Sequence, residues 1–282
     1  MRNNKLIESD IEFYKKPSQI DYLFLGHSKP FAAIDVSQFK NGVQFCAGGE
    51  SNIQTYYKLK HLLENSDKQL KYIVLPYGFA SFNSNKTQLS TNSFYWKKYV
   101  DYIDVGRNSD KFWNYVSVDV KSRVCPYYEY PFLRLSLYYG ELNIVNSKED
   151  YSSLTKLEKQ SLSNRIITTQ MENRDLYSDV SFIYLQKTID LATKYDKKII
   201  YVKYPVSQSY YVVKNDMTEE NSIPVQKFVD QVNIPNENIQ VLDLESVYFD
   251  TDELFKDPQH LKPQGREKFT SLLLDKISSL QL

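Results

Sequence analysis

The sequence predicts an α/β domain built around a parallel sheet. Short apolar runs, rich in β-branched and aromatic residues, alternate along the chain with longer stretches of helical periodicity. Alternation of this kind is typical of sheets whose strands are connected by helices. Polar groups follow the ends of several of these runs, which is where open parallel sheets bind ligands.

Five apolar runs are predicted to be strands, and they cover residues 21–25, 43–46, 72–75, 198–202 and 240–244. Three stretches between or after them are predicted to be helices. Residues 51–63 place apolar side chains at helical spacing with Ser51 as the N-cap, and residues 180–194 repeat the pattern and end in basic residues. Residues 264–277 form the final helix.

The middle of the chain, about residues 81–174, has no regular alternation of strands and helices and is dense in aromatic residues. No linker rich in proline or glycine borders it, no internal repeat is present, and the whole chain has only 8 glycines. We therefore expect a single domain, residues 1–282, with a helical or irregular insertion in its middle.

Charge and cysteine content exclude several function classes. Lysine plus arginine and aspartate plus glutamate each number 35, with no basic block, so nucleic acid is not an expected partner. The two cysteines, Cys46 and Cys125, are too few for a disulfide framework and are expected to be buried thiols. No Cys/His cluster has metal-ligand spacing, so neither a metal nor another cofactor is expected.

The first twenty residues are rich in charge and lack the apolar stretch of a secretion signal. No later segment approaches the roughly 18 apolar residues that a membrane helix needs. As written, the chain is expected to be cytoplasmic and without a transmembrane segment. If an N-terminal anchor has been removed, the expected location is outside the cytoplasm. The sequence gives no prediction of oligomeric state.

The candidate chemistry lies near the two ends of the chain. Ser28 follows the first apolar run, and Asp257 and His260 lie three residues apart before the last helix. A serine hydroxyl needs an imidazole to take its proton, and the imidazole needs a carboxylate to fix its tautomer. These three residues therefore predict a catalytic triad. The competing interpretation makes Ser28 a turn residue and Asp257 a capping residue.

An oxyanion hole is predicted from Ser28, Gly48, Gly49 and Asn52. The two glycines after the second strand permit close approach of a backbone N–H group, and Asn52 can add a side-chain amide. Asn83 is a weaker candidate for the same role.

This arrangement resembles the SGNH hydrolases, also called GDSL esterases and lipases. Gly26-His27-Ser28 looks like their Ser block, Gly48 or Gly49 like their Gly block, and Asp257-x-x-His260 like their last block. The two ends of the chain also resemble a subgroup associated with bacterial surface-polysaccharide synthesis. The resemblance implies a flavodoxin-like three-layer α/β/α sandwich, with Ser28 as nucleophile, His260 as base and Asp257 as its orienting partner.

The chain departs from the family pattern in two places. His27 stands where the usual motif has Asp, and the third strand runs into Pro76-Tyr77-Gly78 without a Gly-x-Asn-Asp motif. Losing one oxyanion donor typically costs about 3 kcal/mol in the transition state, so a slow enzyme remains compatible with the sequence.

Two functions from different classes follow. The first is a serine esterase or O-acyltransferase, such as an acetyltransferase, acting on a saccharide of a bacterial surface polysaccharide. The second is a catalytically defective protein of the same fold that binds carbohydrate or assists assembly. Tyrosine runs such as 127–130 suit sugar stacking, although core packing explains most of the 24 tyrosines as well. Nucleotide binding is disfavoured because neither GxGxxG nor a P-loop is present.

Overall fold

The computed structural model describes residues 10–11, 13–16, 18–78, 81, 93–124, 150–171, 179–216 and 237–280. Its centre is a five-stranded parallel sheet in the order β2-β1-β3-β4-β5. The strands are β1 (Gln19–Phe24), β2 (Gly42–Gln44), β3 (Gln69–Pro76), β4 (Lys198–Lys203) and β5 (Ile239–Asp243). All five predicted strands are present, with β2 ending two residues earlier than predicted.

Alternate strand residues supply two separate cores. Leu23, Ile73 and Ile199 are paired across β1, β3 and β4 and belong to one buried cluster. Their neighbours Phe24, Val74 and Ile200 face the other way into a second cluster. Because side chains alternate along a strand, a sheet buried on both faces needs apolar residues at nearly every position, as these strands have.

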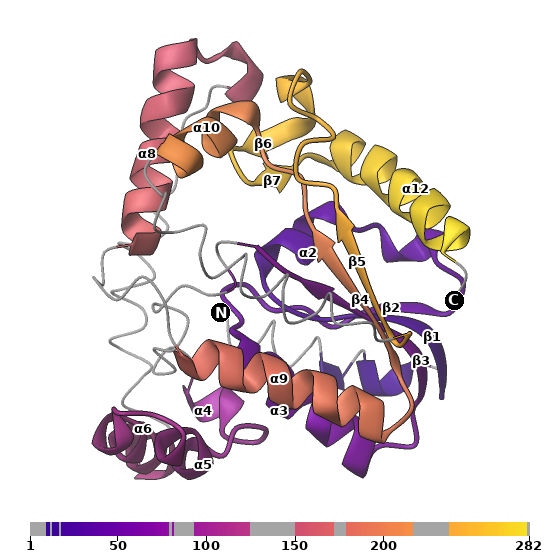
Figure 1. Ribbon diagram of the computed structural model, residues 1–282, viewed down its shortest axis with the longest axis vertical. Helices are drawn as coiled ribbons and strands as arrows, with labels where there is room; N and C mark the ends of the chain where they lie inside the picture. Colours follow the sequence, from indigo (N-terminus) through magenta and orange to yellow (C-terminus); the bar gives the residue numbers. More distant parts are fainter. Residues whose placement is uncertain are drawn as a thin grey trace.

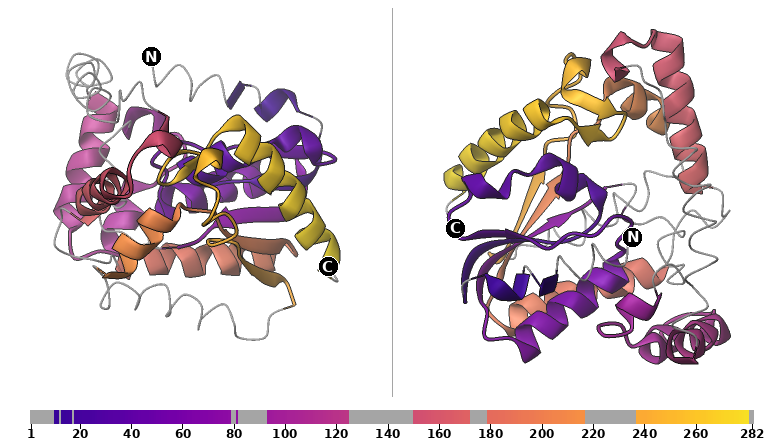
Figure 2. Two further views of the ribbon diagram at one scale, coloured as in Figure 1. Left: turned by 90° about the horizontal axis from the view of Figure 1, so that it is seen from above. Right: turned by 180° about the vertical axis from the view of Figure 1, so that it is seen from behind.

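Helices cover both faces of the sheet (Figures 1 and 2). The first core packs against α3 (Asn52–Asn65) and α9 (Asp179–Lys194). The second packs against α2 (Ser28–Ala33), the 3-10 helix η1 (Val36–Gln38) and α12 (Pro263–Ser279). The predicted three-layer α/β/α fold is therefore confirmed, and its strand order is that of flavodoxin-like folds.

The predicted helix starts follow from local capping chemistry. The Ser51 hydroxyl accepts the N–H of Gln54 at 3.2 Å, and the Gln54 side chain accepts the N–H of Ser51 at 2.9 Å. This reciprocal capping box satisfies two donors at the start of α3. Pro263 opens α12 at a position where a missing N–H costs nothing.

The described part of the predicted insertion is helical. It comprises α4 (Ser93–Trp96), α5 (Tyr102–Arg107), α6 (Phe112–Val124), η4 (Tyr151–Ser153) and α8 (Lys156–Met171). Helix α8 packs on α10 (Gln208–Asp216), whereas α5 contributes to the core beside α3. Residues 82–92, 125–149 and 172–178 lie outside the described part, and with them Asn83, Cys125 and the tyrosine run at 127–130.

The last segment before α12 forms a small hairpin. The 3-10 helix η6 (Asp252–Leu254) leads into β6 (Phe255–Asp257), which pairs antiparallel with β7 (His260–Leu261). Within the described ranges, no helix combines the length and apolar character needed to cross a bilayer.

Candidate active site

Strand β1 runs directly into the segment that carries the predicted nucleophile. Gly26 has φ +109°, and a Cβ atom there would lie 2.6 Å from Cγ and Cδ of Pro76. Glycine is therefore required both by the backbone conformation and by the close approach of β3. Ser28 follows as the first residue of α2, at the carboxyl end of β1. The sheet order reverses beside β1, so Ser28 lies where such folds bind ligands.

His27, between these two residues, is buried, with 6% of its surface exposed. Its Nδ1 atom accepts the backbone N–H of Lys29 at 3.3 Å, so the imidazole is the N-cap of α2. Ser, Thr, Asp and Asn usually fill this position. The residue that departs from the family motif thus has a capping role, and it also lines a cavity next to the site.

The β6–β7 hairpin places the predicted base beside its carboxylate. Oδ1 of Asp257 accepts the backbone N–H groups of Gln259 at 2.9 Å and His260 at 3.1 Å, which fixes the turn. Both carboxylate oxygens lie 2.9 Å from Nδ1 of His260. Asp257 therefore makes the capping interactions that the alternative interpretation gave it and contacts the imidazole as well.

The structure brings the two ends of the chain together at this point. Nε2 of His260 lies 2.9 Å from Oγ of Ser28, although 232 residues separate them. Because a carboxylate only accepts hydrogen bonds, Asp257 places the hydrogen of the neutral ring on Nδ1 and leaves Nε2 to accept from Ser28. The three side chains thus have the contacts that general-base activation of a serine needs.

Contacts between helices α2 and α12 fix the position of Ser28 relative to His260. Nε of Arg266 donates to the carbonyl of Ala32 at 2.9 Å, and the N–H of Asp35 donates to Oγ1 of Thr270 at 2.9 Å. Gly265 allows the start of α12 to approach closely, because a Cβ there would lie 2.5 Å from the carbonyl oxygen of Leu254. Since Ser28 begins α2 and His260 precedes α12, their separation depends on this helix pair.

A second set of bonds supports the hairpin from outside. Ser207 is fully buried, and its N–H donates to the carbonyl of Pro258, inside the hairpin turn, at 2.9 Å. The hydroxyl of Tyr151 donates to Oγ of Ser207 at 2.8 Å. Tyr151 belongs to η4, so Ser207 links the described end of the insertion to the turn between Asp257 and His260.

The environment keeps Asp257 ionised. Burial raises the pKa of this carboxyl, but the hydrogen bond and charge of His260 and the backbone N–H groups of Gln259 and His260 outweigh burial and lower the pKa below its ordinary value. The side chains of Asp257 and His260 are 19% and 29% exposed. The pair is thus partly shielded while His260 stays accessible to a substrate.

The predicted oxyanion residues lie beside this constellation. The N–H of Ala47 donates to the carbonyl of Gly26 at 3.0 Å, which ties the loop after β2 to the segment that carries Ser28. Gly48 and Gly49 follow and are exposed, and Gly49 has φ +78°. The side-chain amide of Asn52 donates to the carbonyl of Ser81 at 3.2 Å. An oxyanion role for Asn52 therefore requires its second amide hydrogen or a change of partner.

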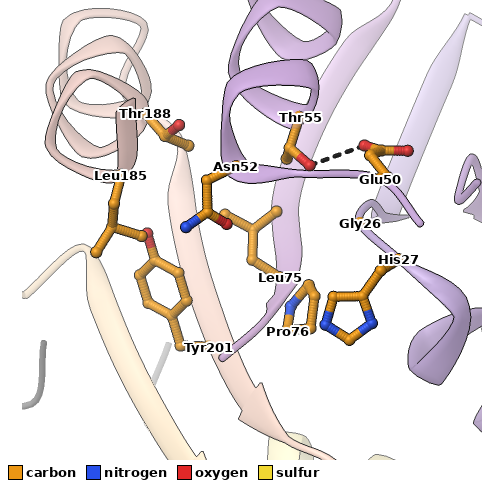
Figure 3. Close-up of a pocket in the computed structure, with 10 residues that line it drawn as sticks. All are labelled: Gly26, His27, Glu50, Asn52, Thr55, Leu75, Pro76, Leu185, Thr188 and Tyr201. Carbon is orange, nitrogen blue, oxygen red and sulfur yellow. Dashed lines mark hydrogen bonds between the residues drawn. The ribbon is translucent and has the colours of Figure 1, made fainter. Parts of the chain in front are cut away.

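A cavity of about 10 Å³ adjoins the site (Figure 3). Gly26, His27 and Glu50 line it on one side, Tyr201 and residues of α9 line the other, and Asn52 lies between them. Its volume is about that of one water molecule, so it is too small for a substrate.

Tyr151 lies near the site although no sequence pattern predicts it there. It is buried and donates to Ser207, 56 residues further along the chain, so local spacing carries no signal of it. Cys46, predicted as a buried thiol, is 7% exposed, and burial raises the pKa of its thiol well above the ordinary value.

Neither a protein family model nor a curated protein sequence matches the chain. A similar solved structure is a crystal structure from Bacteroides fragilis described as "a putative acylhydrolase". It is 10% identical to this chain, the alignment covers 96% of each chain, and the TM-score is 0.42. A likeness of this degree says nothing about activity, which depends on the side chains described above.

Proposed function

We propose that the chain is a serine-dependent acyl hydrolase or acyltransferase of the SGNH type. The observation that supports this most directly is the contact series from Asp257 through His260 to Ser28, at 2.9 Å for each step. Singly, each residue has a structural explanation. Those separate explanations do not account for the combination, because a capped turn has no need of an imidazole that also contacts a serine at the carboxyl end of the first strand.

In the proposed reaction, Oγ of Ser28 attacks the carbonyl carbon of an ester, and its proton passes to Nε2 of His260. The tetrahedral intermediate collapses, the C–O bond to the leaving alcohol breaks, and His260 returns the proton to that alcohol. Water or a sugar hydroxyl then attacks the acyl-enzyme and gives its proton to His260. A second collapse releases the acid or the new ester and restores the Ser28 hydroxyl. Asp257 stays ionised and stabilises the imidazolium.

The oxyanion would be held by backbone N–H groups of Ser28 and of Gly48 or Gly49, with Asn52 as the side-chain donor. The chain offers no residue in the family's Gly-x-Asn-Asp position after β3, so we expect turnover to be slow. Removing one such donor from other enzymes lowers kcat by about 10²- to 10³-fold.

The substrate proposed is an O-acylated saccharide of a bacterial surface polysaccharide, and acetyl is the proposed acyl group. This part rests on the resemblance of the two ends of the chain to a polysaccharide-associated subgroup. Hydrolysis and transfer share the acyl-enzyme, so the acceptor that intercepts it decides between them.

The test compares Ser28→Ala with Ser279→Ala, a matched substitution at the exposed end of α12. We expect Ser28→Ala to lower the turnover of p-nitrophenyl acetate by at least about 10³-fold and to abolish covalent labelling by a fluorophosphonate probe. Ser279→Ala should match the wild type in both assays. Equal turnover and labelling in wild type and Ser28→Ala would rule out serine catalysis.

The second candidate is a non-catalytic carbohydrate-binding or assembly protein with the same fold. The hydrogen bond from Asn52 to Ser81 favours it, because that amide hydrogen is not directed at an oxyanion. Saturable binding of an O-acetylated oligosaccharide, measured by calorimetry, together with no fluorophosphonate labelling of the wild type, would support this alternative over catalysis.

A further inference from the structure

A buried ion pair lies beneath the loop that carries the two glycines. Nζ of Lys58 lies 2.6 Å from Oε2 of Glu50, and the two residues are only 1% and 2% exposed. Removing two charges from water is costly, and well-packed apolar residues often stabilise a protein as well as a buried pair does. The pair is therefore a poor explanation of stability alone, and its other contacts indicate what it holds in place.

The Lys58 ammonium joins both ends of one loop. Besides Glu50, it donates to the carbonyl of Phe45 at 2.9 Å. We call residues 45–50 the glycine loop, because Gly48 and Gly49 lie between these two anchor points. The second carboxylate oxygen of Glu50 accepts the hydroxyl of Thr55 at 2.8 Å, so helix α3 holds the end of the loop through two side chains.

The glycine loop is also bonded to the segment that carries Ser28. The N–H of Phe45 donates to the carbonyl of Phe24 at 2.8 Å, and the N–H of Ala47 donates to the carbonyl of Gly26 at 3.0 Å. Glu50 lines the same small cavity as Gly26 (Figure 3). One face of the loop thus contacts the nucleophile segment, and its ends contact Lys58.

The directions of the backbone N–H groups of Gly48 and Gly49 depend on contacts made by other residues. They are exposed, they lack side chains, and among the described residues other than their immediate chain neighbours no atom lies within 4 Å of a Cβ built on either one. Glycine has the largest conformational freedom of any residue, and a turn closed by the N–H of Glu50 on the carbonyl of Ala47 at 3.1 Å carries both glycines. The direction of their N–H groups therefore depends on how Ala47 and Glu50 are held. An oxyanion donor loses its effect when it moves away from the place where charge develops.

We propose that Lys58 and Glu50 are positioning residues that hold the glycine loop, and with it the backbone N–H donors, at a fixed place relative to Ser28. This inference rests on the proposed acyl-transfer function. Lys58 and Glu50 are buried and contact the loop, so they act through it. Their loss should therefore weaken binding of the transition state more than binding of the substrate.

The test removes both charges together in Glu50→Gln/Lys58→Met, because a single substitution leaves a lone buried charge that endangers folding. A matched control is Lys214→Met/Glu245→Gln, which removes two buried charges 2.8 Å apart that join α10 to the segment after β5. Lys203, which also contacts Glu245, keeps its ion pair with Asp243 in that variant. Thr55→Val is a milder change at the glycine loop, since it removes only the hydroxyl that bonds Glu50.

With p-nitrophenyl acetate as substrate, we expect the Glu50/Lys58 variant to lose at least about 10-fold in kcat with KM within twofold, the pattern of an interaction made only in the transition state. Thr55→Val should also lower kcat with KM little changed, but by a smaller factor. The Lys214/Glu245 variant should keep kcat within twofold at temperatures where all variants are folded. Equal losses of kcat in the two charge-pair variants would overturn the inference, since the effect would then be general destabilisation.

Amide hydrogen exchange supplies a readout that does not depend on activity. We expect the N–H of Ala47 to exchange at least about 10-fold faster in the Glu50/Lys58 variant than in wild type, because its bond to Gly26 opens more often. The N–H groups of β3 should change only as much as global stability does. Unchanged exchange at Ala47 would overturn the inference. Wild-type enzyme without turnover would refute the proposed function and leave this exchange test intact.

Discussion

Three glycines near the candidate site allow backbone strain and steric overlap to be measured separately. Gly48 has no positive φ, and among the described residues other than its chain neighbours no atom lies within 4 Å of the position that an alanine methyl group would take there. Gly49 has φ +78° with the same open surroundings, and Gly26 has φ +109° with Pro76 carbons 2.6 Å from a Cβ. Alanine at position 48 therefore adds neither cost, alanine at position 49 adds backbone strain, and alanine at position 26 adds both strain and steric overlap.

The expected free energies follow from these geometries. Gly48→Ala should stabilise by up to about 1 kcal/mol, because alanine restricts the unfolded chain. Gly49→Ala carries strain of about 1 to 2 kcal/mol, partly offset by the same entropy effect, so a net loss of about 1 kcal/mol is expected. Gly26→Ala adds overpacking of about 1 to 3 kcal/mol against Pro76 to its strain, for a total loss of about 2 to 5 kcal/mol.

Urea unfolding of the three variants, followed by circular dichroism, measures these differences directly. The free energy of unfolding should be highest for Gly48→Ala, lower for Gly49→Ala and lowest for Gly26→Ala. Gly26→Ala should also lose fluorophosphonate labelling in the folded protein, because relief of the overlap moves Ser28 away from His260. A Gly26→Ala protein as stable as Gly48→Ala would refute the close approach of Gly26 to Pro76.

Other predictions concern the surroundings of the triad. Tyr151→Phe removes the donor to Ser207 and should lower kcat several-fold with KM unchanged; a change in KM alone would contradict a positioning role. Gly265→Ala should destabilise by about 1 to 3 kcal/mol in thermal unfolding, because its methyl group meets the Leu254 carbonyl. Asp257 has a lowered pKa, so its ionised form stabilises the fold above the ordinary aspartate value of about 3.9, and this contribution disappears as the pH falls through the folded-state pKa. The stability deficit of Asp257→Asn should therefore shrink as the pH drops below about 4, and a deficit independent of pH would contradict this account.

Local patterns were sufficient to predict the five strands of the parallel sheet and the helices α3, α9 and α12. Each predicted strand overlaps an observed one, and the helix predicted after Ser51 begins where its capping box requires. These features depend on residues a few positions apart, so periodicity and capping chemistry encode them. Strand β2 ends earlier than predicted because only three of its residues pair in the sheet. The periodicity of an apolar run does not show which of its residues will pair with another strand.

The surroundings of the site were far less predictable. Glu50 and Lys58 lie eight residues apart, and they meet because Glu50 precedes the first turn of α3 and folds back over that helix. Tyr151 reaches Ser207 across 56 residues of chain. Such contacts depend on how elements pack, and a single sequence has no short-range signal for packing.

The sequence by itself determined the alternation of strands and helices, the approximate ends of the strands and the three residues proposed for catalysis. The tertiary structure alone decided that Ser28 lies 2.9 Å from His260 and that a buried ammonium holds the glycine loop. The physical reason is that periodicity and capping act within a few residues. A contact between residues 232 positions apart instead requires the strand order of the sheet and the packing of α2 on α12, which only the folded chain as a whole provides.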